Sequence, residues 1–385
     1  MANNKQIAQA IENLSVLVQQ IERGGVFGKP DWTAWRKENV ALIDEALDYH
    51  RQDGMPESGV LVKPFFHPRL PLIGLNYTPV AHNTLHLFGE RGWTWPLRLC
   101  RGIVFERSGR LVALPFPKFF NYGEHPETTR EPFGPFEATV KHDGHLGIVF
   151  EYDGQWLITT RGTFGYRTAK LGQAMLEASA ELKDWMDWLD PNVNPLVEII
   201  HPETKVHLKY RKARLILIGA NNRATYADAN HLELRALGRL MGLEVTKRWT
   251  GTKLVELQKH IHDLTVRNRE GFVVRMADGR RIKFKFKSYL SLMIGAKLSP
   301  HYIMNRMMNG SYEKLMADLD YEIQCQAARL VQEMCAAAGD VSVRPLKERR
   351  QRLYELLADP KSQYQRGICR KFLTWLDEDR RKRQQ

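Results

Sequence analysis

The clearest chemical pattern in this sequence is the stretch Lys141–Gly144, which reads Lys-His-Asp-Gly. A β-type segment leads into the lysine, and the acid-glycine pair then turns the backbone. Two alternating apolar segments follow and are joined at Asp153-Gly154, a dipeptide favoured in hairpins. A lysine amine held at such a turn can act as a nucleophile. Because so short a pattern recurs by chance, a surface lysine beside a turn is the alternative interpretation of the pattern alone.

Four more charged residues stand at the ends of apolar segments or inside them. Arg101 precedes the run Gly-Ile-Val-Phe, and Lys118 precedes an aromatic pair. Glu198 is the carboxylate inside an otherwise apolar strand-like run, and Glu270 precedes Gly-Phe-Val-Val. Two cations that face phosphates would account for Arg101 and Lys118. A solvated strand end and a packed core pair are the alternatives for the two cations.

Three lysines alternate with apolar residues in the run 281–287. Side chains of a strand repeat every two residues, so Lys283, Lys285 and Lys287 share one face of the predicted strand. Lys283 is the least supported of the three as a site residue, and a solvated lysine is its alternative interpretation.

The composition indicates a globular protein with a polyanionic partner. The 385 residues suffice for two or three domains, and 43% are hydrophobic, so most of the chain should fold around packed cores. Lys and Arg number 57 against 44 Asp and Glu, a net charge of +13 that favours nucleic acid before membrane. The four cysteines include no C-x-x-C pair, which argues against a zinc site or a disulfide framework. The absence of a signal-peptide core or a long apolar run predicts a soluble, cytoplasmic protein.

Helix and strand signals predict three domains, over residues 1–55, 56–292 and 293–385. The first is an N-terminal helical extension, the second mixes short β-like segments with helices, and the third is helical. The last of these carries 12 Lys and Arg against 6 Asp and Glu from Pro345 onward. The predicted helices span about 3–22, 32–50, 164–190, 229–241, 300–309, 312–338, 345–358 and 361–381.

In this order the patterns resemble the ATP-dependent RNA ligases typified by phage RNA ligase 1, which are covalent nucleotidyltransferases. The resemblance covers roughly residues 97–292. Its elements are R-G-I-V-F from Arg101, K-F-F-N from Lys118, K-x-D-G from Lys141, R-G from Arg161, the strand residue Glu198, E-G-F-V from Glu270, and the paired Lys285 and Lys287. The resemblance implies an α+β nucleotidyltransferase domain of antiparallel sheets with flanking helices, followed by an all-helical C-terminal domain.

The resemblance also implies a role for each matching residue. Lys141 would attack the α-phosphate of ATP and carry the AMP. An ammonium ion cannot attack, so Lys285, Lys287 and bound Mg²⁺ (or Mn²⁺) would favour the neutral amine and then balance charge in the transition state. Arg101 and Lys118 would hold the β- and γ-phosphates, Arg161 would contact ribose, and Gly144 would allow close backbone approach. Glu270 is the first candidate metal ligand; Glu198 is the second, with ribose binding as its alternative.

The predicted function is an ATP-dependent RNA ligase that joins 5′-phosphate and 3′-hydroxyl RNA ends. One alternative is a DNA ligase or RNA capping enzyme of the same superfamily; those usually carry a small β-barrel after the paired-lysine strand, where this sequence turns helical. Another is a non-catalytic, basic RNA-binding protein, which the presence of Lys141, Glu270 and the lysine pair argues against. We expect a monomer with RNA as its partner and no membrane association.

Overall fold

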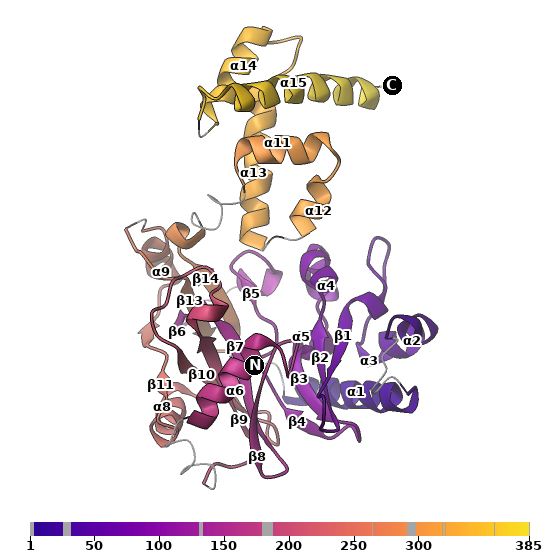
Figure 1. Ribbon diagram of the computed structural model, residues 1–385, viewed down its shortest axis with the longest axis vertical. Helices are drawn as coiled ribbons and strands as arrows, with labels where there is room; N and C mark the ends of the chain where they lie inside the picture. The colour runs from indigo at the N-terminus through magenta and orange to yellow at the C-terminus, as the bar shows by residue number, and fades with distance from the viewer. Residues whose placement is uncertain are drawn as a thin grey trace. The chain divides into compact units, whose positions relative to one another are not determined.

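The computed structural model describes residues 4–25, 32–130, 134–178, 188–263, 265–290, 298–317, 319, 321–357 and 359–384. The chain divides into two compact units, Met1–Phe286 and Lys287–Gln385. The first unit contains three β-sheets with helices around them, and the elements described in the second are helices (Figure 1). The predicted α+β class is therefore confirmed.

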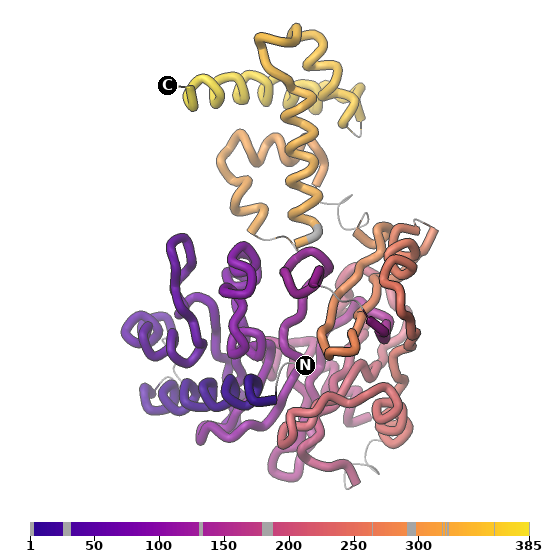
Figure 2. Tube along the Cα trace, turned by 180° about the vertical axis from the view of Figure 1, so that it is seen from behind, coloured from indigo at the N-terminus to yellow at the C-terminus, as the bar shows by residue number. Residues whose placement is uncertain are grey.

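A four-stranded antiparallel sheet follows the N-terminal helices. Its order is β1-β2-β3-β4, formed by Val62–Phe66, Leu72–Tyr77, Arg101–Glu106 and Leu111–Ala113. Helix α1 (Asn4–Arg23) buries the predicted apolar stripe, and its residues share one core cluster with this sheet and with α5 (Trp95–Leu99). Both ribbon and tube show α1, in indigo, beside the strands (Figures 1 and 2). Short helical segments connect these elements: η1 (Ser58–Val60), α4 (Pro79–Thr84) and η2 (Leu85–Arg91).

The helix expected over 32–50 is two shorter helices, and this prediction was wrong in its length. Helix α2 (Trp32–Glu38) ends at Asn39, whose ψ of 31° leaves the helical range, and α3 (Val40–Ala46) begins after it. Asp48 then adopts a left-handed φ of 49°. Asn and Asp tolerate such backbone conformations better than other residues with side chains, so the chain turns here despite the continuing apolar pattern.

A second sheet contains five strands in the order β11-β10-β9-β7-β8. They span Glu244–Val245, Arg214–Asn222, Val193–Ile200, His145–Tyr152 and Gln155–Thr160. The predicted hairpin at Asp153-Gly154 joins β7 to β8, with φ of 53° and 71° at these residues, as a two-residue turn of this type requires. Helices α6 (Arg167–Ala178) and α8 (His231–Leu240) pack on the sheet in a shared core. The remainder of the predicted helix 164–190 falls largely outside the described residues.

The third sheet carries the Lys141 strand next to its centre. Its order is β12-β6-β13-β14-β5, formed by Arg248–Gly251, Phe136–Lys141, Gly271–Met276, Arg281–Lys285 and Phe120–Asn121. Only β14 and β5 run parallel within it. The register aligns Lys141 with Gly271 and Gly271 with Lys285. Two short 3₁₀ turns, η3 (Pro126–Thr128) and η4 (Pro202–Thr204), and α9 (Leu254–Ile261) lie in the connections.

The second unit packs its helices around its own apolar core. They are α11 (Pro300–Met308), α12 (Tyr312–Ala317), α13 (Tyr321–Ala338), α14 (Leu346–Glu355) and α15 (Gln363–Gln384). Predicted as one helix, 312–338 is divided in two, with Leu319 in a bend between them. The buried Arg349 forms an ion pair with Asp377 at 2.6 Å and thereby joins α14 to α15. No helix in the described part of the chain is long and apolar enough to cross a membrane.

Candidate active site

Strand pairing brings the predicted nucleophile against one of the predicted carboxylates. Lys141 is the last residue of β6, and Glu270 immediately precedes β13, which pairs with β6. The Lys141 Nζ atom lies 2.5 Å from Glu270 Oε1, and the lysine side chain keeps 22% of its surface exposed. Glu270 is 5% exposed, and its Oε2 has no hydrogen-bond partner. The amine is thus accessible, while the carboxylate offers a buried, unused oxygen to a bound group.

The turn after Lys141 is held by its own acid and glycine. Asp143 is buried, and its Oδ2 accepts hydrogen bonds from the backbone N–H groups of His207, at 2.8 Å, and Leu208. Gly144 N–H donates to Glu198 Oε1 at 2.9 Å, and a Cβ at Gly144 would lie 2.6 Å from the Ile199 carbonyl oxygen. The close approach predicted for Gly144 is therefore required, here by the protein's own backbone. The link from Asp143 to residues 207–208 had no signal in the sequence.

Glu198 lies on β9 beside these residues and has an unusual charge environment. The surrounding protein removes it from solvent, which raises its pKa to about 7. Lys141 lowers this pKa, Glu270 raises it, and Arg101 lowers it. The carboxylate therefore lies within the electrostatic reach of three of the predicted site residues. Glu198 pairs with β10 and β7 in the second sheet, whereas Lys141 lies in the third sheet and Arg101 in the first, so this convergence is a consequence of how three sheets meet.

Three of the predicted nucleotide-binding residues, Arg161, Lys118 and Arg101, form a second group around Tyr77. Arg161 Nη1 donates a hydrogen bond to the Tyr77 hydroxyl at 3.0 Å, and Lys118 Nζ lies 5.5 Å from the centre of the Tyr77 ring. Arg101 Nη1 is buried without a hydrogen-bond partner. Burial by itself would raise the pKa of Tyr77, but Lys118 first, then Arg161 and Arg101, lower it to about 7. This shift reflects the positive charge of Lys118, Arg161 and Arg101. These residues form a cationic group that would suit an anion.

Lys118 is more deeply placed than the sequence indicated. Its side chain is 1% exposed, with Nζ 4.7 Å from the ring centres of both Trp93 and Phe120. Glu124 Oε1 lies 3.5 Å from the same nitrogen. Lys118 therefore packs in an aromatic core, as one alternative held, and its ammonium also lies near Tyr77; its contact with phosphates stays a prediction.

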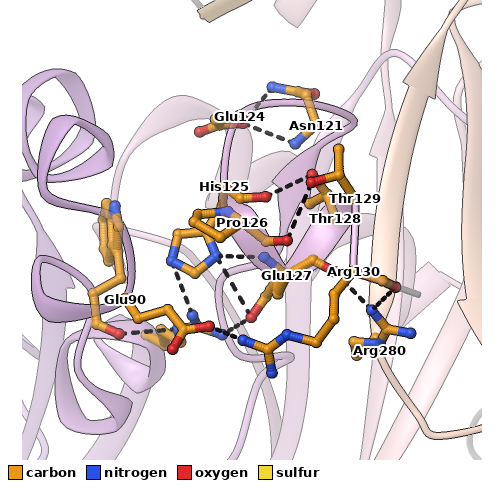
Figure 3. Close-up of polar contacts among 12 residues, drawn as sticks. Glu90, Asn121, Glu124, His125, Pro126, Glu127, Thr128, Thr129, Arg130 and Arg280 are labelled. Atoms are coloured by element: carbon orange, nitrogen blue, oxygen red, sulfur yellow. Dashed lines mark hydrogen bonds and ion pairs between the residues drawn. The ribbon is translucent and has the colours of Figure 1, made fainter. Parts of the chain in front are cut away.

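The loop that carries Glu124 is tied to its surroundings by polar contacts (Figure 3). Glu124 Oε2 accepts hydrogen bonds from the Asn121 backbone N–H at 2.8 Å and its side-chain amide at 2.6 Å. His125 stacks on Phe120 with ring centres 4.3 Å apart. Glu127 forms an ion pair with Arg98 at 2.6 Å. Glu124 and Tyr77 are members of the site region that sequence reasoning missed, because neither lies in a recognisable local pattern.

The two lysines of the predicted pair differ in their placement. Lys285 is half-buried on β14, aligned through Gly271 with Lys141. Gly271 lies between Lys141 and Lys285 in the sheet. A Cβ on Gly271 would lie 1.9 Å from the Phe284 carbonyl oxygen, so glycine permits the close pairing of β13 with β14 at this position. Lys287 is exposed and begins the second compact unit.

The carboxylates can be tested as metal ligands. Among the described residues no group of three or more His, Cys, Asp or Glu side chains could hold an ion by itself. Glu270 nevertheless has a buried oxygen without a partner, and it lies close enough to Glu198 for its charge to raise the pKa of Glu198. Mg²⁺ commonly takes one or two carboxylates and completes its shell with water and substrate phosphates. These residues fit an ion that binds together with a nucleotide.

Comparison with known proteins agrees with this geometry. Residues 99–290 match the family described as RNA ligase. A protein of Thermovibrio ammonificans named "Putative RNA ligase" is 31% identical over 187 residues, which are 47% of this chain and 48% of that protein. The region 99–290 thus belongs to the RNA ligase family, as the sequence patterns predicted. The chain spans about half the length of this relative.

Solved structures with a similar fold include ligases of more than one kind. An archaeal ATP-dependent RNA ligase is 16% identical, with a TM-score of 0.47 over 78% of this chain and 74% of that one. A structure described as "Putative ATP-dependent DNA ligase" from Aquifex aeolicus is 14% identical, with a TM-score of 0.45 over the same shares. Naegleria gruberi RNA ligase with pyrophosphate is 19% identical, with a TM-score of 0.35 over 41% of this chain and 51% of that one.

Proposed function

We propose that this protein is an ATP-dependent RNA ligase that joins 5′-phosphate and 3′-hydroxyl RNA ends through a lysyl-AMP intermediate. The observation that carries the proposal is the accessible Lys141 amine 2.5 Å from the buried Glu270 carboxylate, in a region that belongs to the RNA ligase family. The cationic group around Tyr77 supports it, because a triphosphate needs several positive partners.

The reaction divides into three displacements at phosphorus. The neutral Lys141 amine attacks the α-phosphorus of ATP, a nitrogen–phosphorus bond forms, and the bond to the β-phosphate oxygen breaks to release pyrophosphate. An oxygen of the RNA 5′-phosphate then attacks the lysyl-AMP phosphorus and frees Lys141. Finally, the 3′-hydroxyl attacks the adenylated 5′-phosphate, joins the strands and releases AMP.

Each site residue has a task in the first displacement. Arg101 and Lys118 hold the β- and γ-phosphates so that pyrophosphate leaves opposite the attacking nitrogen. Lys285 and Lys287 balance the charge that develops on the phosphate oxygens. Arg161 contacts the ribose, and Gly144 lets the backbone approach the nucleotide. Glu270, with Glu198, would hold Mg²⁺ or Mn²⁺, which supplies further positive charge to the phosphate oxygens when bound.

The second unit supports an RNA ligase over its relatives with other substrates. Every element described in Lys287–Gln385 is helical, where a DNA ligase or capping enzyme usually continues into a small β-barrel. We assign RNA binding to this unit, and place the protein in the cytoplasm as a monomer, where ATP and RNA ends are both present.

The test is incubation of the purified protein with α-labelled ATP and Mg²⁺. The label should become covalently attached to the protein and should be released by added pyrophosphate. The adenylated protein should then join RNA strands with 5′-phosphate and 3′-hydroxyl ends but not strands with 5′-hydroxyl ends. A protein that binds RNA and never becomes labelled would contradict the proposal, and joining of DNA ends alone would change its substrate.

A further inference from the structure

Strand register places Lys283 on the nucleotide side of its sheet. Lys283 aligns with Val273 and through it with Thr139, just as Lys285 aligns through Gly271 with Lys141. Aligned residues of a sheet present their side chains to the same face, so Lys283 and Lys141 share one face. On its other side Lys283 aligns with Asn121 of β5, and its carbonyl accepts a hydrogen bond from the Tyr122 N–H at 3.0 Å. Lys283 therefore lies between the Lys141 strands and the segment that carries Lys118 and Glu124.

The side chain of Lys283 belongs to the cationic group and is half-buried, which argues against the alternative of a fully solvated lysine. Its Nζ atom lies 4.9 Å from the centre of the Phe119 ring, and the Arg101 guanidinium lies 5.4 Å from the same ring. Lys118 and Glu124 are also within electrostatic reach of Lys283. Lys283 thus shares its surroundings with both residues to which we assign the β- and γ-phosphates.

The charges in this group do not balance. Four cations, Lys283, Lys118, Arg101 and Arg161, act on Tyr77, whereas the opposite charges that act on Lys283 are those of Glu124 and Tyr77. Glu124 lies 3.5 Å from Lys118 and so offsets that charge first. Arg101 Nη1 has no hydrogen-bond partner although it is buried. Both the excess charge and the unused donor indicate that an anion completes the group.

We propose that Lys283 is a third phosphate-binding residue of the nucleotide site and contacts the β- and γ-phosphates of ATP beside Arg101 and Lys118. This inference rests on the function proposed above. It assigns the residue to the part of ATP that leaves as pyrophosphate, not to the AMP that remains on the protein.

A proton should accompany the phosphates. Burial first, and then the charges of Lys118 and Arg101, lower the pKa of Lys283 to about 7, while Glu124 and Tyr77 raise it. In the nucleotide-free protein at pH 8 most Lys283 amines are therefore neutral. A bound polyphosphate supplies negative charge that favours the ammonium form, so the site takes up a proton as ATP binds. AMP lacks the β- and γ-phosphates and should bind without this uptake.

Isothermal titration calorimetry can count these protons. MgATP is titrated into a Lys141→Ala protein, which cannot form the adduct, at pH 8 in two buffers with different heats of ionisation. The proton count with ATP should exceed that with AMP. In Lys283→Arg, which keeps the charge permanently, ATP affinity should be retained and the count with ATP should fall by about one proton, while the contributions of Tyr77 and Glu198 remain. In Lys283→Met, ATP affinity should fall about tenfold or more while AMP affinity is unchanged.

Lys63→Met, at an exposed position of β1, is the matched control for removing a lysine and should alter neither quantity. The inference is overturned if ATP binds Lys283→Met with the affinity and proton count of the parent. It is equally overturned if Lys283→Arg retains the full uptake, a test that remains available should Lys283→Met fold poorly. If the Lys141→Ala protein without a change at Lys283 does not bind MgATP at all, the proposed function fails as well as the inference. Failure of the inference alone leaves this binding intact, so the two failures are distinguishable.

Discussion

Lys141 and Glu270 are 129 positions apart in the numbering and form an ion pair because antiparallel pairing aligns β6 with β13. Sequence reasoning assigned them to nucleophile and metal ligand separately. The buried carboxylate orients the lysine side chain, while the amine stays accessible. Because the two residues are in contact, the effects of changing each of them should not be additive.

Lys141→Ala should abolish the covalent AMP adduct and leave the fold intact. The side chain is partly exposed at the end of a strand, so its truncation removes the nucleophile without opening a cavity in the core. Labelling with α-labelled ATP measures the adduct, and circular dichroism checks the fold. Lys63→Ala, an exposed lysine of β1, is the control and should label normally. Undiminished labelling of Lys141→Ala would refute the mechanism.

Lys285→Ala and Lys287→Ala should each slow adenylation by about 10²–10³, because each removes a donor from developing charge on phosphate. Single-turnover labelling at saturating ATP measures this rate. Lys283→Ala should act mainly on ATP affinity, so its loss should be much smaller once ATP saturates the protein. Equal rates for all three variants at saturation would mean that the division of tasks between Lys283 and the pair Lys285 and Lys287 is wrong.

At the scale of elements, the loop from Asn121 to Arg130 connects the cationic group to the body of the first unit. Two hydrogen bonds hold Glu124 to Asn121, and the Arg98–Glu127 ion pair fixes the following turn (Figure 3). A second His-Pro-Glu-Thr turn, at 201–204, repeats this local structure, with its histidine accepting a hydrogen bond from the glutamate N–H in both places. His125 is buried whereas His201 is half-buried, and the burial of His125 affects how stability depends on pH.

Acid should destabilise the first unit through His125. Burial first, and then the charge of Arg98, lower the pKa of His125 to about 4, from an ordinary 6.5. The unfolded chain therefore gains a proton below pH 6.5 that the folded chain takes up only near pH 4. Stability is complete above pH 6.5 and decreases as the pH falls through this window, by about 2 kcal/mol at most between pH 6.5 and 5.

Chemical denaturation of the wild type and of His125→Asn at pH 7.5 and pH 5 checks this expectation. Asn can retain the acceptor for the Glu127 N–H, so the variant should lose less stability than the wild type on acidification. His201→Asn, in the same tetrapeptide at a more exposed position, is the control for the cost of changing the cap. Identical pH dependence in wild type and His125→Asn would contradict the assignment.

At the scale of the whole molecule, most of the residues that we assign to the nucleotide and the densest positive charge lie in different units. Lys141, Glu198 and Glu270 lie in the unit Met1–Phe286, whereas α15 of the second unit ends in exposed Arg381, Lys382 and Arg383. Contacts from Lys and Arg to phosphates supply affinity without base specificity and weaken as salt rises. We therefore expect adenylation and RNA binding to be separable by mutation.

The triple change Arg381→Gln, Lys382→Gln, Arg383→Gln should weaken RNA binding and reduce the steepness of its salt dependence, by up to about two units in the log–log slope for single-stranded RNA. Adenylation should be unchanged. The charge-matched control replaces the exposed Lys63, Arg69 and Lys259 by Gln. Fluorescence anisotropy across a salt series measures both. RNA affinity unchanged in the α15 variant would mean that its basic end is a solvated surface.

Deletion of the second unit tests the same separation more severely. A fragment ending near Met293 retains Lys287 and the nucleotide motifs and should still form the Lys141 adduct. Its RNA joining should fall much further than its adenylation. Loss of both activities in a fragment that remains folded would indicate that the helices serve the nucleotide site itself.

The sequence by itself determined the local elements and the identity of the chemical groups. Alternation of apolar residues predicted β7, β8 and the β13–β14 hairpin, since these patterns depend on the two-residue repeat of a strand and on turn residues with defined backbone angles. The motif order likewise predicted the family of residues 99–290. Where a local pattern continued across a residue such as Asn39, the same reasoning extended a helix too far.

Tertiary structure alone decided which groups share an environment. Lys283, Lys285 and Lys287 have equivalent positions in the linear pattern, yet Lys283 aligns with Asn121 of β5 and its Nζ lies 4.9 Å from the Phe119 ring, whereas β14 ends at Lys285. Glu198 and Tyr77 reach the site region from two other sheets. Burial, charge and pKa depend on neighbours that are distant in sequence, and no periodicity along the chain records them. The structure was therefore needed to distinguish a solvated lysine from one that we assign to the phosphates.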